Sequence, residues 1–126
     1  MSLKLVSHAR ILLIGLEPQL SAELSVVLSS DGHTVHQSSH FDAERWDPAD
    51  LIFCSSKVEC FEPLQQFVRR NRPGLPIIVV SRCPEVSEWL DAMDNGAADY
   101  CAAPFEMSQI RWILESNLPY RRAAVA

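Results

Sequence analysis

The chain has 126 residues, of which 48% are hydrophobic and 21% charged, and its formal net charge is −5. A chain of this length forms one domain (1–126) around one core, and we expect only the tail from about residue 120 to be loose. The acidic balance argues against nucleic-acid binding by this domain, because such binding relies on clustered Lys and Arg. No stretch approaches the ~18 consecutive apolar residues of a membrane span, and the first residues do not form a signal peptide. We therefore expect a cytoplasmic protein that makes no membrane contact.

Cysteines and histidines give no sign of a metal or cofactor site. The four cysteines are Cys54, Cys60, Cys83 and Cys101, and no two of them have the C-x-x-C spacing of zinc or redox motifs. Cys54 and Cys101 lie inside apolar segments, where a free thiol behaves as a small hydrophobe, so we expect both to be buried. The histidines form no ligand-like cluster. We expect no metal and no cofactor.

The first half of the chain predicts two strands, one full helix and one stunted helix. Residues 10–15 form a continuous aliphatic run, which is typical of a strand covered on both faces. One helix face follows at Leu20, Leu24, Val27 and Leu28. Residues 34–37 are a weaker strand candidate. Only about a dozen residues precede the next apolar run, which is close to the minimum for a parallel crossover, so residues 41–46 are expected to form a short or irregular second helix.

The second half alternates three strands with three helices. Continuous apolar runs at 51–54 and 76–81 predict two buried strands, and residues 100–102 predict a weaker third. Three sets of apolar residues at helical spacing predict helix faces that pack on the core: Phe61, Leu64, Phe67 and Val68; Val86, Trp89, Leu90 and Met93; and Met107, Ile110, Ile113 and Leu114. This alternation predicts a doubly wound α/β fold of the flavodoxin type, with a parallel five-stranded sheet in the order 2-1-3-4-5.

In such a sheet, ligands bind beyond the carboxyl ends of the strands, near the point where the strand order reverses. The residues that follow the predicted strands are Gly15, Leu16 and Glu17; Ser55, Ser56 and Lys57; Ser81 and Arg82; and Ala102, Ala103 and Pro104. We expect these residues to converge on one crevice.

Four segments resemble, in order, the receiver domains of response regulators in two-component systems. They are ILLIGLEPQL, PADLIFCSS, LPIIVVS and AMDNGAADYCAAPFEMSQI. The similarity extends over essentially the whole chain. It implies a receiver fold and a signal-transduction module of a two-component or phosphorelay pathway rather than an enzyme.

The resemblance also implies a phosphorylation site that this chain has lost. Receiver domains carry two acids after the first strand that hold Mg²⁺, a phospho-accepting Asp after the third, Thr or Ser after the fourth, and Lys before the Pro of the fifth. The corresponding residues here are Gly15 and Leu16, Ser55, Ser81, and Ala103, and the one nearby acid is Glu17. Mg²⁺ prefers carboxylate oxygens, and a Ser hydroxyl needs a base to become a nucleophile. We therefore expect a pseudo-receiver that neither binds Mg²⁺ nor accepts phosphate.

Several residues of the crevice have two interpretations. Glu17 either pairs with Lys57 or Arg82 across the crevice, or simply begins the first helix before Pro18. The serines either hold a small anion or satisfy backbone groups of the loops. Tyr100, at the aromatic switch position of receivers, either switches together with Ser81 or packs as an ordinary strand residue.

The resemblance implies that the last two helices and the strand between them contact a protein partner or a second copy. Candidate interface residues are Trp89, Tyr100, Arg111 and Trp112. Trp89 also completes an apolar stripe, which favours burial, and partial burial is the alternative for Trp112 as well. Two other functions remain open: a sensor of a small anion or metabolite in the crevice, and a receiver that accepts phosphate at a displaced residue.

Overall fold

The computed structural model describes residues 8–44, 48–82 and 85–118. Five parallel strands form one sheet in the order β2-β1-β3-β4-β5. The strands are β1 (Arg10–Ile14), β2 (Thr34–Ser38), β3 (Leu51–Ser55), β4 (Ile77–Ser81) and β5 (Asp99–Ala102). The predicted doubly wound α/β fold is confirmed, and each strand begins and ends within one residue of its expected position. The tail from about residue 120 lies outside the described residues.

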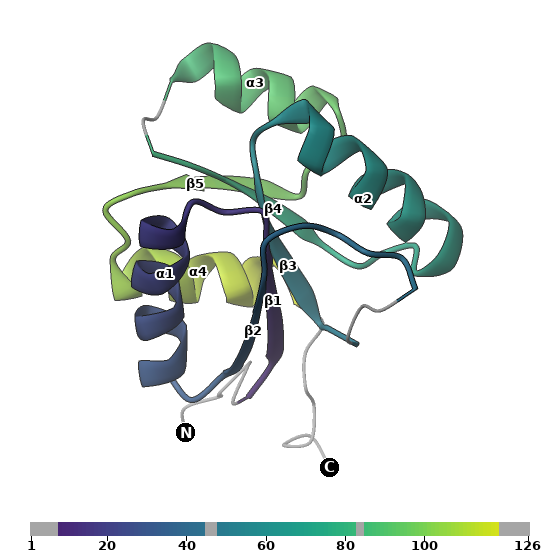
Figure 1. The fold of residues 1–126 in the computed structure, drawn as a ribbon. Coiled ribbons are helices and arrows are strands. Elements are labelled where there is room, and N and C mark those ends of the chain that lie inside the picture. Colours follow the sequence, from purple (N-terminus) through teal and green to yellow (C-terminus); the bar gives the residue numbers. More distant parts are fainter. Residues whose placement is uncertain (1–7, 45–47, 83–84, 119–126) are drawn as a thin grey trace.

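Helices cover both faces of the sheet. They are α1 (Pro18–Ser30), α2 (Val58–Asn71), α3 (Val86–Asp94) and α4 (Met107–Asn117). Figure 1 shows α1 and α4 on one face and α2 and α3 on the other. None of the described helices is long and apolar enough to cross a membrane.

The connection between β2 and β3 is irregular, as expected for the second crossover. Residues 39–44 and 48–50 contain no helix, and residues 45–47 lie outside the described part of the chain. Phe41 holds this connection against α2, because its ring lies 5.1 Å from the ring of Phe67, centroid to centroid. The short crossover therefore follows from chain length, and one aromatic contact anchors it.

Each face of the sheet has its own core, because successive strand residues point to opposite sides. Leu13, Phe53 and Ile78 pack against α1 and α4. Cys54 and Val79 belong to the cluster under α2 and α3. β3 and β4 are buried along their whole length, which explains their continuous apolar sequences.

The expectation that α3 turns its large apolar residues toward the core is wrong. Val86, Trp89, Leu90 and Met93 are all exposed, with 38% to 71% of their surface accessible. Ala92 is the buried residue of this helix. α3 packs beside β5, which is the edge strand of the sheet. No further strand lies beyond β5 to cover the larger side chains of α3. The apolar stripe of α3 therefore lies on the surface.

Candidate functional site

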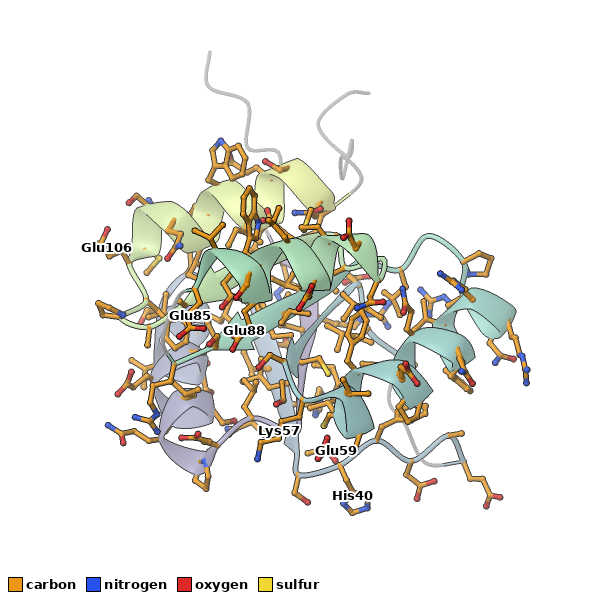
Figure 2. The ribbon with its side chains drawn as sticks, turned by 90° about the horizontal axis from the view of Figure 1, so that it is seen from above. His40, Lys57, Glu59, Glu85, Glu88 and Glu106 are labelled. Atoms are coloured by element: carbon orange, nitrogen blue, oxygen red, sulfur yellow. The ribbon has the colours of Figure 1, made fainter. Side chains whose placement is uncertain are left out.

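A cleft of about 230 Å³ opens at the carboxyl ends of β1, β3 and β4. The strand ends, the loops that follow them and the first turn of α3 line the cleft. The polar side chains of the lining include Glu17, Ser55, Lys57, Ser81, Arg82, Glu85 and Glu88, and Gly15 and Leu16 also line it. Figure 2 shows Lys57, Glu85 and Glu88 on the same side of the molecule. Ala103 and Tyr100 are not part of the lining. The Ala103 N–H donates to the carbonyl of Ser81 at 3.1 Å.

Gly15 has no room for a side chain. Its φ of 72° lies in the left-handed region, and its N–H donates to the Ser38 carbonyl at 2.9 Å. A Cβ at this position would overlap the sulfur of Cys60, which belongs to the first turn of α2. The thiol of Cys60 thus fills the space beside Gly15.

Glu17 pairs with Arg82 across the cleft and also begins α1. Its carboxylate accepts a hydrogen bond from the Arg82 guanidinium, and both side chains are half-exposed. Glu17 is the N-cap residue, and Pro18 follows as the first residue of the helix. The hydrogen bond from Arg82 lowers the pKa of Glu17, and the charge of Lys57 adds a smaller effect. The pair links the β1–α1 loop to the β4–α3 loop.

Ser55 satisfies a loop backbone group. Its Oγ accepts a hydrogen bond from the Lys57 N–H at 3.2 Å, at the start of α2, and the residue is buried. This arrangement corresponds to the structural interpretation of the serine, in which the hydroxyl stabilises a turn.

Tyr100 connects β5 to α3. Its hydroxyl donates to Glu88 Oε1 at 2.9 Å. Burial and the Glu88 carboxylate raise the pKa of Tyr100, and a hydrogen bond with Ser81 opposes them. The ring packs against the core cluster under α2 and α3. The tyrosine is therefore both a packed strand residue and a polar link to a residue that lines the cleft.

The donor set of the cleft does not fit the Mg²⁺ of a receiver domain. Gly15 and Leu16 offer no side-chain oxygen, and the carboxylate of Glu17 is paired with Arg82. Within the described ranges, no group of three or more His, Cys, Asp or Glu side chains is placed to hold a metal ion. The cleft instead contains the carboxylates of Glu17, Glu85 and Glu88 beside two cations.

Two of the candidate interface residues are exposed aromatics. Trp112 has 63% of its surface accessible and Trp89 has 44%. The structure thus favours exposure over burial for both residues. Arg111 is engaged within the chain instead, because its guanidinium donates to both carboxylate oxygens of Asp31 at 2.8 to 3.1 Å. This bidentate pair ties α4 to the end of α1.

Three residues with a thiol or carboxylate at or beside the cleft were not anticipated as site residues: Cys60, Glu85 and Glu88. Cys60 and Gly15 are separated in the chain by α1, β2 and β3, and no sequence motif indicates that the two residues meet. Glu88 lies in the first turn of α3, and a carboxylate near a helix start is ordinarily explained by the helix dipole alone. Neither contact leaves a sequence signal that we recognise.

Comparisons with known proteins agree with this fold. No family model matches the sequence. A curated relative, the transcriptional regulatory protein TcrA of Mycobacterium tuberculosis, is 29% identical over 112 residues. The match covers 83% of this chain and 44% of TcrA, so the chain spans less than half the length of that relative.

Solved structures of receiver domains are similar in three dimensions. A response regulator receiver domain protein from Clostridium thermocellum superposes with a TM-score of 0.69 at 18% identity, covering 86% of this chain and 93% of that one. The beryllofluoride-activated NtrC4 receiver domain, solved as a dimer, gives 0.65 at 18% identity and covers 85% and 93%. The chain therefore has the flavodoxin-like fold of receiver domains.

Proposed function

We propose that this chain is a pseudo-receiver, a signalling module of the two-component type that acts through protein contacts and does not accept phosphate. The receiver fold and the similarity to a transcriptional regulator support the signalling role. The observation that carries the proposal is the space beside Gly15, which the thiol of Cys60 occupies, so that no carboxylate enters the cleft from this position.

The chemistry of phosphoryl transfer explains why this observation matters. A metal ion and positive side chains neutralise the charge on the transferring group, and without them the barrier stays high. Here the remaining acid, Glu17, is held by Arg82. The Ser55 hydroxyl accepts from a backbone N–H, and among the described hydrogen bonds none joins it to a carboxylate or imidazole that would activate it.

Intact-mass spectrometry tests this proposal. The protein is incubated with acetyl phosphate, with and without Mg²⁺, beside a receiver domain that keeps its acceptor Asp as the positive control. We expect the mass to stay unchanged under both conditions while the control gains one phosphoryl group. A metal-dependent gain would refute the proposal and support the alternative of a displaced acceptor, which peptide mapping would then identify.

The proposed contact surface is the α3–β5–α4 face, defined here by Val86, Trp89, Leu90, Met93 and Trp112. All five are exposed, and exposed aromatic residues are frequent anchors of protein interfaces. The NtrC4 receiver domain forms a dimer in its activated state. By analogy, the partner is a second copy of this chain or another protein of the same pathway.

Sedimentation velocity over a range of concentrations, together with co-purification from the source cells, tests this surface. Trp112→Glu places a charge on the proposed face, and Val26→Glu is the matched control, because Val26 on α1 is 65% exposed. We expect Trp112→Glu to abolish the association and Val26→Glu to preserve it. Equal behaviour of both variants would reject the face.

The alternative of an anion sensor receives less support. Glu85 and Glu88 line the same cleft as Lys57 and would repel an anion, and the Ser55 hydroxyl already accepts a hydrogen bond. A thermal-shift screen with inorganic phosphate and small carboxylates examines this possibility. A stabilisation that Ser55→Ala or Ser81→Ala abolishes would favour the sensor.

A further inference from the structure

Two cysteines lie against each other beside the cleft. Cys54, near the end of β3, is completely buried, and Cys60, in the first turn of α2, is partly exposed. Cys60 packs against the core cluster that contains Cys54, and the two thiols hydrogen-bond one another. Both also adjoin the end of β1, because Cys54 is in register with Ile14 and Cys60 Sγ contacts Gly15.

The two thiols differ in reactivity. The hydrogen bond from Cys54 lowers the pKa of Cys60 to about 7, and the charge of Lys57 contributes in the same direction, against the opposing effects of burial and Glu59. A position in the first turn of a helix also favours a thiolate. The hydrogen bond to Cys60 and burial raise the pKa of Cys54. Cys60 is therefore the nucleophile and Cys54 the resolving thiol.

We propose that Cys54 and Cys60 form a reversible disulfide when Cys60 reacts with hydrogen peroxide, so that the module carries an oxidation site beside its crevice. In the first step the Cys60 thiolate attacks one peroxide oxygen, the O–O bond breaks, and a sulfenic acid and hydroxide form. In the second step the Cys54 sulfur attacks the Cys60 sulfur, the S–O bond breaks, and the oxygen leaves as water. The two thiols lose two electrons in total, and the peroxide is reduced to water. Exchange with a small thiol restores both cysteines.

The bond would alter the crevice directly. It would close a ring through Ser55, Ser56 and Lys57, which line the cleft. A disulfide holds its sulfurs at about 2.05 Å, far closer than two hydrogen-bonded thiols, so the Cys60 sulfur must move toward Cys54. The bond would thereby shift the thiol that lies beside Gly15 in the reduced protein.

Non-reducing peptide mapping of the full chain after treatment with hydrogen peroxide tests the proposal. We expect the intact mass to decrease by two hydrogen atoms and the peptides with Cys54 and Cys60 to be joined. Cys60→Ser should abolish the change, and Cys101→Ser should preserve it, because burial raises the pKa of Cys101 to about 12. A Cys83→Ser, Cys101→Ser double variant leaves Cys54 and Cys60 as the two cysteines of the chain and should form the same bond.

The rate of the reaction provides a second readout that needs no substitution. Formation of the bond should accelerate from about pH 6 to about pH 8, since the Cys60 thiolate is the reactive form. Protein unfolded in urea serves as the reference and should react more slowly near neutral pH. The proposal is overturned by a bond to Cys83 or Cys101, by a bond between chains, by oxidation of Cys60 without loss of two hydrogens, or by equal rates in folded and unfolded protein.

Discussion

The sulfur of Cys60 lies in the space into which a side chain at position 15 would point. Glycine is therefore favoured at position 15 for two reasons: its positive φ and its contact with the Cys60 sulfur. The first turn of α2 is in this way fitted to the end of β1.

Gly15→Ala should destabilise the protein more than Gly74→Ala does. Both glycines have positive φ, 72° and 96°, but a Cβ at Gly74 would meet nothing within 4 Å. The strain at Gly74 should lower the free energy of unfolding by about 1–3 kcal/mol. Gly15→Ala should cost about 1–3 kcal/mol more, because the added carbon overlaps Cys60. Urea denaturation of both variants measures the difference.

The excess cost at Gly15 should disappear in a Cys60→Ala background. In that variant the nearest Cys60 atom that remains is the Cβ, 3.6 Å away, which is an ordinary van der Waals contact. Gly15→Ala should then cost about as much as Gly74→Ala. If the excess cost is the same in both backgrounds, the overlap with the thiol does not explain it.

Glu17 should titrate below its ordinary range in the folded protein. The hydrogen bond from Arg82 lowers its pKa from 4.5, so the ion pair stabilises the fold above that pH and its contribution is lost as the pH falls through the folded value. Arg82→Gln should raise the pKa of Glu17, and Lys57→Gln should raise it less. Carboxyl carbon chemical shifts measured by NMR follow the titration. An equal effect of the two variants would contradict the assignment of Arg82 as the main partner.

His33 should make the protein less stable below about pH 6.5. Its Nδ1 accepts a hydrogen bond from the Ala9 N–H at 3.0 Å, and its side chain is 2% exposed. Burial lowers its pKa from 6.5 and His8 contributes, although Asp31 acts in the opposite direction. The unfolded chain therefore binds the proton at a higher pH than the folded one, and the free energy of unfolding falls as the pH drops from 6.5 to the folded pKa.

Melting temperatures measured at a series of pH values test this prediction. His33→Asn keeps an acceptor for the Ala9 N–H and removes the titrating ring, so its stability should vary less over this range. His40→Asn, on an exposed residue, is the control and should behave like the unsubstituted protein. A pH dependence that survives in His33→Asn would assign the effect to another group.

The strands and their order could be predicted from the sequence because parallel sheets bury both faces. The continuous apolar runs that became β3 and β4 are typical of strands covered on both faces, and 2-1-3-4-5 is a common strand order for five alternating strands and helices. Part of the crevice lining follows in turn, since parallel strands end at one edge, but the predicted Ala102, Ala103 and Pro104 do not line the cleft, whereas Glu85 and Glu88 do. The orientation of α3 could not be predicted, because periodicity identifies an apolar stripe but not what it faces.

The contacts within the crevice depend on loop geometry, which spacing does not specify. Glu17 had two possible cations, and the sequence alone did not show that the partner is Arg82. Tyr100 reaches Glu88 only because α3 packs beside β5. Such pairs join positions distant in sequence, and no local pattern encodes them.

Substitutions of Ile110 and Trp112, both on α4, should separate effects on the free energy of unfolding from effects on partner binding. Ile110 is 1% exposed, so Ile110→Ala should lower the free energy of unfolding by about 2–5 kcal/mol. Trp112 is 63% exposed, so Trp112→Ala should change it by no more than about 0.5 kcal/mol. Chemical denaturation measures both values, and sedimentation measures association in the same samples. If Trp112→Ala costs as much stability as Ile110→Ala, Trp112 belongs to the core and not to an interface. A stable Trp112→Ala protein that no longer associates would instead assign the exposed indole to partner binding.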